Sequence, residues 1–188
     1  WEAVAHVLAR MGAQVVLTAR DRTLLERVKT AIEQFSGKAV VIPCDLTDGE
    51  TIAALGRQVA ERFGRIDILV NNAGIGQASI RADQRRQPIR FWEASPEQWQ
   101  LFVTVNATAP ILLTRAVLPH MLAARRGRIV TVTTSLGTMV RPGYLLYGAS
   151  KAAAEAAMAG LSGDLAATGV TCNVLVPGGV TNTPLVGE

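Results

Sequence analysis

The sequence predicts an α/β domain built around a doubly wound parallel sheet. Short runs of β-branched and apolar residues alternate with longer amphipathic runs along all 188 residues, which is typical of parallel βαβ units. The strand-like runs are apolar at consecutive positions, as expected for strands that helices cover on both faces. No linker or repeat interrupts the alternation, so we expect one domain over residues 1–188.

The expected elements follow one another in a regular order. Five short apolar runs are predicted to be strands: Val15–Ala19, Ala39–Pro43, Ile66–Val70, Arg128–Thr133 and Val170–Val176. Five longer runs are predicted to be helices: Trp1–Met11, Arg22–Phe35, Asp48–Phe63, Ser95–Ala124 and Tyr147–Thr168. The fourth helix has a well-marked start, because Ser95 can cap it, Pro96 suits its first position and Glu97 suits its first turn.

One long segment, from Gly76 to Glu93, has no periodicity and is rich in arginine. It is longer than an ordinary connection inside a compact domain. Two interpretations stay open, a loop beside a substrate and a mobile insertion, and the sequence does not choose between them.

The two ends of the sequence bear on how much of the fold it contains. The chain opens inside the helix Trp1–Met11 and stops soon after Pro177 and Gly178. A doubly wound sheet that binds a dinucleotide has a strand and a glycine-rich turn before such a helix, because the phosphates bind at the helix N-terminus. We therefore expect the domain to be incomplete at both ends, with its first strand and its phosphate-binding turn outside this sequence.

The composition excludes several classes of protein. Hydrophobic residues make up 49% and charged residues 18% of the chain, as in soluble globular proteins and unlike disordered tails. We find no apolar run long enough to cross a bilayer and no signal peptide, so we expect no membrane association and a cytoplasmic location.

The charges and cysteines carry little functional signal. The net charge of +4 does not indicate a nucleic-acid partner, because the arginines form no stripe with interleaved aromatic residues. The cysteines Cys44 and Cys172 lie in apolar runs without metal-ligand spacing, which predicts buried reduced thiols and no metal site. The arginines gather in one loop and at one helix end, where solvation and the helix dipole explain them: Arg81, Arg85, Arg86, Arg90, Arg125, Arg126 and Arg128.

Tyr147 and Lys151 form the sharpest local pattern in the chain. Residues four apart at the start of a helix lie on one face, one turn from each other. A tyrosine hydroxyl has a pKa of about 10, too high for ready proton exchange at neutral pH, and a nearby ammonium group lowers that pKa. The alternative, from these two residues alone, is a surface tyrosine beside a solvated lysine.

Other polar side chains precede this pair. Thr134 and Ser135 leave the carboxyl end of the predicted strand Arg128–Thr133, where a hydroxyl can donate a hydrogen bond to a carbonyl oxygen that gains charge. Side chains alternate across a strand, so only one of the two hydroxyls can face Tyr147. Asn106 is a polar residue in an apolar stretch of the fourth helix. Taken alone, its presence there is explained equally well by a helix kink or by a helix amide whose hydrogen bonds are satisfied.

A run of small residues, Asn71-Asn72-Ala73-Gly74, follows the predicted strand Ile66–Val70. A tight turn at a carboxyl end of the sheet is where ligands bind in open α/β folds. The same residue types are ordinary turn formers, so this motif alone favours an ordinary turn.

Taken together, these motifs resemble those of the short-chain dehydrogenase/reductase family along nearly the whole chain. The resemblance implies a Rossmann-type fold and an NAD(P)-dependent enzyme. The separations from Asn106 to Thr134, Tyr147 and Lys151 match the family's tetrad. The other matching pieces are Asp45, Asn71-Asn72-Ala73-Gly74 and Asn173-x-x-x-Pro177-Gly178.

The resemblance implies that the catalytic residues are Asn106, Thr134, Tyr147 and Lys151. Tyr147 would be the general acid and base, Lys151 would lower its pKa and hold the nicotinamide ribose, and Asn106 would support a water relay to Lys151. The family usually has serine at the position of Thr134, and Ser135 comes one residue too late. Threonine keeps the hydroxyl but adds a methyl group and a stiffer χ1.

The cofactor side is implied in the same way. Asp45 would touch the adenine, and the backbone near Gly74 would pack along the cofactor. The segment from Pro177 to Thr183 would reach the nicotinamide carboxamide, with Thr183 at an interval from Pro177 that departs from the family's pattern. The implied cofactor-binding residues are Arg20, Asp45, Leu46, Asn72, Ala73, Gly74, Tyr147, Lys151, Pro177, Gly178, Val180 and Thr183.

The loop after the first predicted strand bears on the choice of cofactor. It reads Thr18-Ala19-Arg20-Asp21, without an acid where an NAD-preferring member binds the ribose diol. Arg20 is placed to meet a 2′-phosphate instead. This predicts NADP, and the alternatives are a solvated Arg20 and use of NAD through the neighbouring Asp21.

Three functions stay open. They are an oxidoreductase that acts on a ketone or secondary alcohol, a dinucleotide-binding regulatory protein without turnover, and a truncated product that neither binds nor catalyses. Intact Tyr147 and Lys151 favour the first. The helices Ser95–Ala124 and Tyr147–Thr168 resemble those of the family's four-helix dimer contact, which implies a homodimer or homotetramer.

The substrate is expected to be a small carbonyl or alcohol compound. A 3-oxoacyl chain, a steroid-like ketone and a sugar all remain open, because the fold does not choose among them. An apolar pocket edge is expected from the residues between Thr134 and Tyr147: Val140, Arg141, Tyr144, Leu145 and Leu146.

Overall fold

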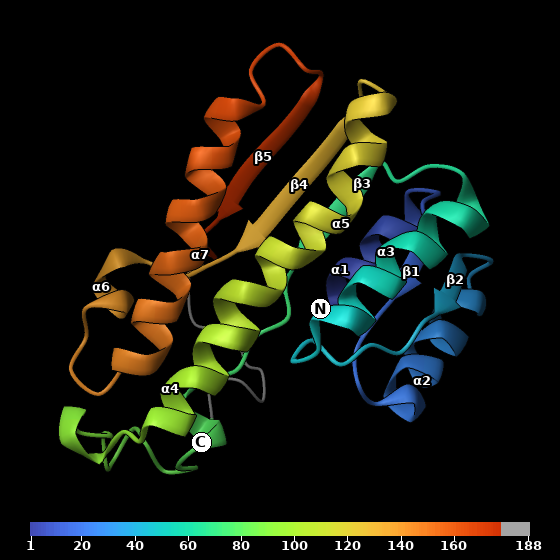
Figure 1. Ribbon diagram of the computed structural model, residues 1–188. Helices are drawn as coiled ribbons and strands as arrows, with labels where there is room; N and C mark the ends of the chain where they lie inside the picture. Colours follow the sequence, from blue (N-terminus) through green and yellow to red (C-terminus); the bar gives the residue numbers. More distant parts are fainter. Residues whose placement is uncertain (178–188) are drawn as a thin grey trace.

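The computed structural model describes residues 1–177, which form helices packed on parallel strands (Figure 1). The five strands expected from the sequence are present, with bounds shifted by no more than two residues. Three short helical segments are η1 (Gln77–Ser79), η2 (Phe91–Glu93) and the π-helix η3 (Thr104–Thr108). The other elements are α1 (Glu2–Arg10), β1 (Gln14–Leu17), α2 (Arg22–Glu33), β2 (Lys38–Val41), α3 (Gly49–Phe63), β3 (Ile68–Asn71), α4 (Pro96–Val103), α5 (Ala109–Ala123), β4 (Gly127–Val132), α6 (Leu136–Met139), α7 (Leu145–Asp164) and β5 (Val170–Leu175).

The strands form two parallel ladders where the sequence predicted one sheet. β1 pairs with β2, and β4 pairs with both β3 and β5, so that Ile129 lies opposite Leu69 on one side and Cys172 on the other. Helix α3 packs against α5, and the apolar cluster between them includes Ile42, just after β2, and Leu69 of β3. Gly56 of α3 allows this close approach, because a Cβ there would lie only 2.7 Å from the Cβ of Ala116.

Local sequence signals set the ends of several helices. The carboxylate of Asp21 accepts a hydrogen bond from the Leu24 amide at 3.0 Å and caps α2. Ser95 and Gln98 cap α4 reciprocally, as a capping box. Gly64 ends α3 in the left-handed region, with φ of 69°. The start expected for the fourth helix is therefore confirmed.

Apolar clusters lie on both sides of the α3–α5 contact. One surrounds β1 and β2 and includes the fully buried Leu25 and Ile32. Another lies under β4 and β5 and includes Met121 and Cys172, and a third between α3 and α5 includes Cys44. Both thiols are buried and free, as the sequence predicted, and burial raises the pKa of each.

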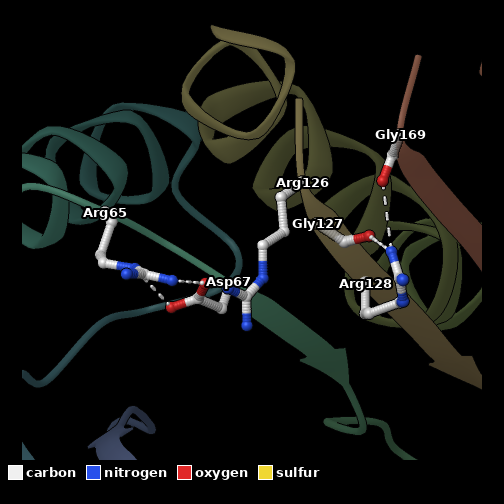
Figure 2. Close-up of polar contacts among 6 residues, drawn as sticks. All are labelled: Arg65, Asp67, Arg126, Gly127, Arg128 and Gly169. Atoms are coloured by element: carbon white, nitrogen blue, oxygen red, sulfur yellow. Dashed lines mark hydrogen bonds and ion pairs between the residues drawn. The ribbon is translucent and has the colours of Figure 1, made fainter. Parts of the chain in front are cut away.

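Arginines near the amino ends of β3 and β4 bind local acceptors (Figure 2). Asp67 lies between Arg65, whose Nε donates to Oδ2 at 2.9 Å, and Arg126, whose Nε is 3.6 Å from Oδ1. The hydrogen bond from Arg65 lowers the pKa of Asp67 below its usual value. Arg128 donates to the carbonyl of Gly169 at 3.2 Å. Part of the positive charge is therefore paired within the fold.

The segment 76–93 packs against the loop that precedes α7. Gln77 is buried and donates through Nε2 to the carbonyl of Gly143 at 3.5 Å. A Cβ on Gly143 would lie 2.8 Å from the Cβ of Pro88, so the two segments are in close contact. The segment therefore packs on the rest of the fold through Gln77 and Pro88.

The helical run Pro96–Ala123 corrects the expectation that no apolar run is long enough to cross a bilayer. By length and composition it could cross a membrane, since an 18-residue window within it has a mean hydropathy of 1.6. Part of that window is buried inside the fold, and the run packs against α3, α7 and the strands β3 and β4. A core helix has the same apolar character, so the run is weak evidence for a membrane span.

Candidate active site

The candidate site lies where β3 and β4 end and α7 begins (Figure 1). Tyr147 and Lys151 stand on the first two turns of α7, which begins at Leu145, two residues earlier than expected. Gly74 follows β3, and Thr134 follows β4. Segments far apart in the sequence thus meet at the carboxyl edge of the β3–β4–β5 ladder, where ligands bind in such folds.

Lys151 is held inside the site. Its side chain is only 5% exposed, and its Nζ donates to the main-chain carbonyl of Val132 at 3.0 Å. The ammonium group lies 6.0 Å from the centre of the Tyr147 ring. Burial lowers the pKa of Lys151 from 10.5 to about 8, because desolvation penalises the charged form. The alternative of a solvated lysine is excluded.

Tyr147 departs from one expectation. Burial, and to a smaller extent the charge of Tyr144, raise its pKa above the ordinary value of 10.0. The expected lowering by Lys151 is not among the causes of the shift, and burial, which disfavours the tyrosinate, is the largest of them. In this structure Tyr147 therefore holds its proton at neutral pH.

Asn106 is completely buried in the π-helix η3, which separates α4 from α5 within the single helix expected from the sequence. Its Oδ1 accepts from the amide of Ile75 at 2.9 Å, and its Nδ2 donates to the carbonyl of Ile75 and to Oγ of Ser150, each at 3.0 Å. Both explanations offered by the sequence apply, since the helix is irregular there and the amide is satisfied. Such π-turns occur often at functional sites.

Gly74 lies next to the amide of Asn106 and the ammonium group of Lys151. A Cβ at this position would lie 3.0 Å from Oδ1 of Asn106 and 3.2 Å from Nζ of Lys151. A side chain here would therefore press on both groups. The strand before this turn ends at Asn71, whose Nδ2 donates to the hydroxyls of Thr114 and Thr131 inside the fold, so Asn71 anchors the turn from within.

The two hydroxyls after β4 have different surroundings. Ser135 is exposed and caps the short helix α6, where its Oγ accepts from the amide of Thr138 at 3.3 Å. Thr134 is partly buried, and among residues 1–177 its hydroxyl has no hydrogen-bond partner. Of the two side chains, only that of Ser135 is therefore engaged in the cap of α6.

The expected cofactor-binding residues on the other ladder lie after β1 and β2. Arg20 is exposed, and its charge reaches Asp45, whose pKa is lowered chiefly by hydrogen bonds from Thr47. Asp45 Oδ1 accepts from the amide and the hydroxyl of Thr47 at 2.9 and 2.8 Å. Leu46 is partly buried and packs on the cluster between α3 and α5. These residues share one edge of the β1–β2 ladder.

The remaining cofactor-binding residues lie near the turn after β3 and beyond β5. Asn72 is partly buried, while Ala73 is exposed. Pro177 is exposed at the end of the described segment. Three of the expected residues lie outside the described residues: Gly178, Val180 and Thr183.

Comparison with known proteins decides the family. The sequence profile of the family described as short chain dehydrogenase matches residues 2–188. The chain belongs to the short chain dehydrogenase family. Membership confirms the resemblance drawn from the motifs, the Rossmann-type fold and the class of enzyme, an oxidoreductase.

Relatives of this family span several named activities. The chain is 36% identical to an uncharacterized oxidoreductase of Staphylococcus saprophyticus, over 98% of the chain and 75% of the relative. It is also 36% identical to the human dehydrogenase/reductase SDR family member 7, over 100% of the chain and 55% of that protein. A 3-oxoacyl-[acyl-carrier-protein] reductase of Synechocystis is 32% identical over 94% of the chain and 68% of its own length. The chain thus spans between about half and three quarters of these relatives.

Solved structures of the family share the fold. A metagenomic short-chain oxidoreductase in complex with NADP superimposes with a TM-score of 0.85, at 34% identity over 95% of this chain and 77% of that one. A short-chain dehydrogenase from Streptomyces avermitilis superimposes with a TM-score of 0.83, at 30% identity over 99% of this chain and 63% of that one.

Three groups in the family site escaped the sequence analysis. They are the main chain of Ile75, the carbonyl of Val132 and the hydroxyl of Ser150. No residue pattern marks a main-chain acceptor. Ser150 did offer a signal, since it is a hydroxyl directly before Lys151 on the face that α7 buries.

Proposed function

We propose that the chain is an NADP(H)-dependent oxidoreductase that transfers a hydride between nicotinamide and a ketone or secondary alcohol. Tyr147 acts as the general acid and base. The observation that carries the proposal is the pair on α7, in which Lys151 is buried and fixed by the carbonyl of Val132, one turn from Tyr147. Asn106, from η3, and Gly74, from the turn after β3, lie next to this pair.

The residues present fit a dinucleotide. Gly74 has no side chain, so Asn106 and Lys151 can both lie close to its backbone, with the ammonium group held at the carboxyl edge of the ladder. When bound, the nicotinamide supplies or accepts the hydride. Lys151 would hold its ribose, Asp45 its adenine and Arg20 its 2′-phosphate. The other proposed contacts are Leu46, Asn72, Ala73, Tyr147 and Pro177, with Gly178, Val180 and Thr183 beyond the described residues.

The proton chemistry is assigned to the pair on α7. The hydroxyl of Tyr147 is protonated at neutral pH and can donate to a carbonyl oxygen that becomes an alkoxide. Because burial raises the pKa of Tyr147, this transfer depends on a nearby positive charge that favours the tyrosinate. Lys151, with a pKa of about 8, is still largely charged there and stabilises the tyrosinate left behind. The hydroxyl of Thr134 donates a second hydrogen bond to the same oxygen. In the oxidation direction the same groups act in reverse.

The contacts of Asp21 support NADP over NAD. Its carboxylate is engaged as the N-cap of α2 by the Leu24 amide at 3.0 Å. An acid used in this way is a poor acceptor for the hydroxyls of an adenosine ribose. Arg20, one residue earlier, is exposed and charged, which suits a 2′-phosphate.

The substrate side is apolar. Val140, on the loop between α6 and α7, is 71% exposed, and Leu145, the first residue of α7, is 37% exposed. Both lie close to Tyr147 in the chain. A small cavity lies where the segment 76–93 meets the start of α7, and its lining residues are Gln77, Ile89, Arg90, Ala94, Gly143, Leu145 and Leu146. We therefore expect a compound in which an apolar group flanks the carbonyl carbon.

The assembly follows from the long helices. The α4–α5 run exposes the apolar side chains of Trp99, Leu101 and Ile111, and α7 exposes Leu145 at its start. These surfaces support a homodimer or homotetramer formed through the two helical runs, which light scattering of the full-length protein tests.

The experiment that tests this function is a panel of ketones and secondary alcohols with the full-length protein, followed through the absorbance of reduced nicotinamide. We expect turnover with at least one apolar carbonyl compound and a higher kcat/KM with NADPH than with NADH. Arg20→Ala should erase most of that preference. The control Arg22→Ala, at an exposed arginine on the first position of α2, should leave the preference intact. Preference for NADH together with unchanged NADPH use in Arg20→Ala would contradict the cofactor assignment.

A further inference from the structure

We propose that Ser150 is a positioning residue of this active site. Its hydroxyl fixes the amide of Asn106 relative to the first turn of α7, which carries Tyr147. The inference rests on the proposed function, because the effect is expressed in the turnover of that site. It adds a residue that acts through Asn106 and does not touch the reacting atoms.

The hydroxyl of Ser150 is used in both of its capacities. The side chain is fully buried. Its Oγ donates to the carbonyl of Tyr147 at 3.0 Å, three residues back on α7, and accepts from Nδ2 of Asn106 at 3.0 Å. The first contact is common for serine inside a helix. The second joins α7 to the π-helix η3, so one oxygen atom links Asn106 to the turn that carries Tyr147.

The other contacts of Asn106 show what this link controls. Its Oδ1 and the second proton of its Nδ2 form a two-point pair with the main chain of Ile75. That pair fixes the amide to the turn after β3 but not to α7. The third contact, with Ser150, sets the distance between that turn and the helix.

Lys151 lies close enough to Asn106 to be affected when the amide of Asn106 moves. Oδ1 of Asn106 and Nζ of Lys151 both lie within 3.2 Å of the point where a Cβ of Gly74 would stand. The amide oxygen and the ammonium group are therefore neighbours across Gly74. A shift of Asn106 changes the polar surroundings of Lys151 and, with them, its support of Tyr147.

Ser150→Ala isolates the hydroxyl. Alanine is the strongest helix former and removes a single oxygen atom, so α7 is retained. One buried N–H of Asn106 then loses its acceptor, which is an unfavourable state that the amide relieves by turning. We expect kcat to fall about tenfold, which matches the net free energy of one ordinary hydrogen bond that no longer holds Asn106 in place, while the KM for NADPH changes less than about twofold.

A double-mutant cycle separates this role from a general loss of packing. In the full-length protein, kcat is measured for the wild type, Ser150→Ala, Asn106→Ala and the double variant. If Ser150 acts through Asn106, its removal has no further effect once Asn106 is alanine. The matched control is Ser162→Ala, an exposed serine on the same helix, which should retain wild-type kcat.

A second measurement does not depend on turnover. Hydrogen exchange of the Ile75 amide, which donates to Oδ1 of Asn106, should be faster in Ser150→Ala and unchanged in Ser162→Ala. An inactive wild type would refute the proposed function, and the exchange result would still decide whether Ser150 holds the amide. Wild-type kcat in Ser150→Ala, an equal loss in both Asn106 backgrounds, or unchanged Ile75 exchange would each overturn the inference.

Discussion

Replacing Lys151 by methionine should make the protein more stable at neutral pH while it removes activity. The ammonium group is 5% exposed, and burial lowers its pKa from 10.5 to about 8. That difference corresponds to a penalty of about 3 kcal/mol on the folded state when the lysine is charged. Methionine keeps the aliphatic volume without the charge, but it gives up the hydrogen bond to the carbonyl of Val132, a loss of about 1 kcal/mol. The net gain is about 2 kcal/mol.

The sign of the pH dependence follows from the same shift. The folded pKa of Lys151 lies below the unfolded value, so the penalty is present in full below about pH 8 and disappears as the pH rises to 10.5. The advantage of Lys151→Met should therefore be largest at neutral pH and shrink above about pH 8. Near pH 10.5 it should turn into a deficit of about 1 kcal/mol, because only the lost hydrogen bond remains.

Urea unfolding of the wild type and Lys151→Met across this pH range measures the difference directly. Lys151→Leu serves as a second uncharged variant and should show the same pH trend. A methionine variant that is less stable than the wild type at neutral pH, or a difference that does not change with pH, would refute the reasoning about desolvation.

Three further predictions concern other parts of the fold. Thr134→Ala should lower kcat by a factor of roughly 10²–10³, whereas Thr134→Ser should be active. Ser135→Ala should lose about 1 kcal/mol of stability, because the N-cap of α6 is missing, with little change in kcat. The opposite ranking of kcat would place the substrate-binding hydroxyl one residue later. Gly74→Ala should lower kcat/KM on the order of a hundredfold, because its Cβ displaces the amide of Asn106 and the ammonium group of Lys151. The control Gly160→Ala adds a Cβ in open space and should leave kcat/KM unchanged and the stability equal or higher. Equal kinetics in both variants would contradict the crowding at Gly74. Asp67→Asn should reduce stability by less than about 1 kcal/mol at neutral pH, since the ion pair is largely exposed; because the pKa of Asp67 is lowered, this loss should disappear at acid pH, and urea midpoints that differ equally at both pH values would contradict it.

The sequence predicted those elements whose cause is local. Alternating apolar runs and the helix signal at Ser95 identified the five strands and the long helices, because periodicity and capping depend on near neighbours. Tyr147 and Lys151 were found for the same reason, since their spacing places them on adjacent turns of one helix.

The rest depends on contacts between distant segments. The π-helix η3 accompanies the bonds of Asn106 to Ile75 and Ser150, which lie 31 and 44 residues away in the chain. The raised pKa of Tyr147 follows from burial that only the folded chain defines. The pairing of strands into two ladders and the buried path of the run Pro96–Ala123 are likewise tertiary properties. Composition and periodicity do not determine them.

Tyr147→Phe tests the central claim most directly, because it removes one oxygen atom from the proposed general acid and base. With the full-length protein and the carbonyl compound identified in the substrate panel, turnover of NADPH and the thermal shift caused by NADPH are measured side by side for this variant and the wild type. We expect turnover to be lost and the thermal shift to be preserved, since the ring and the buried Lys151 remain in place. Turnover at the wild-type rate in Tyr147→Phe would contradict the assignment of proton transfer to this tyrosine.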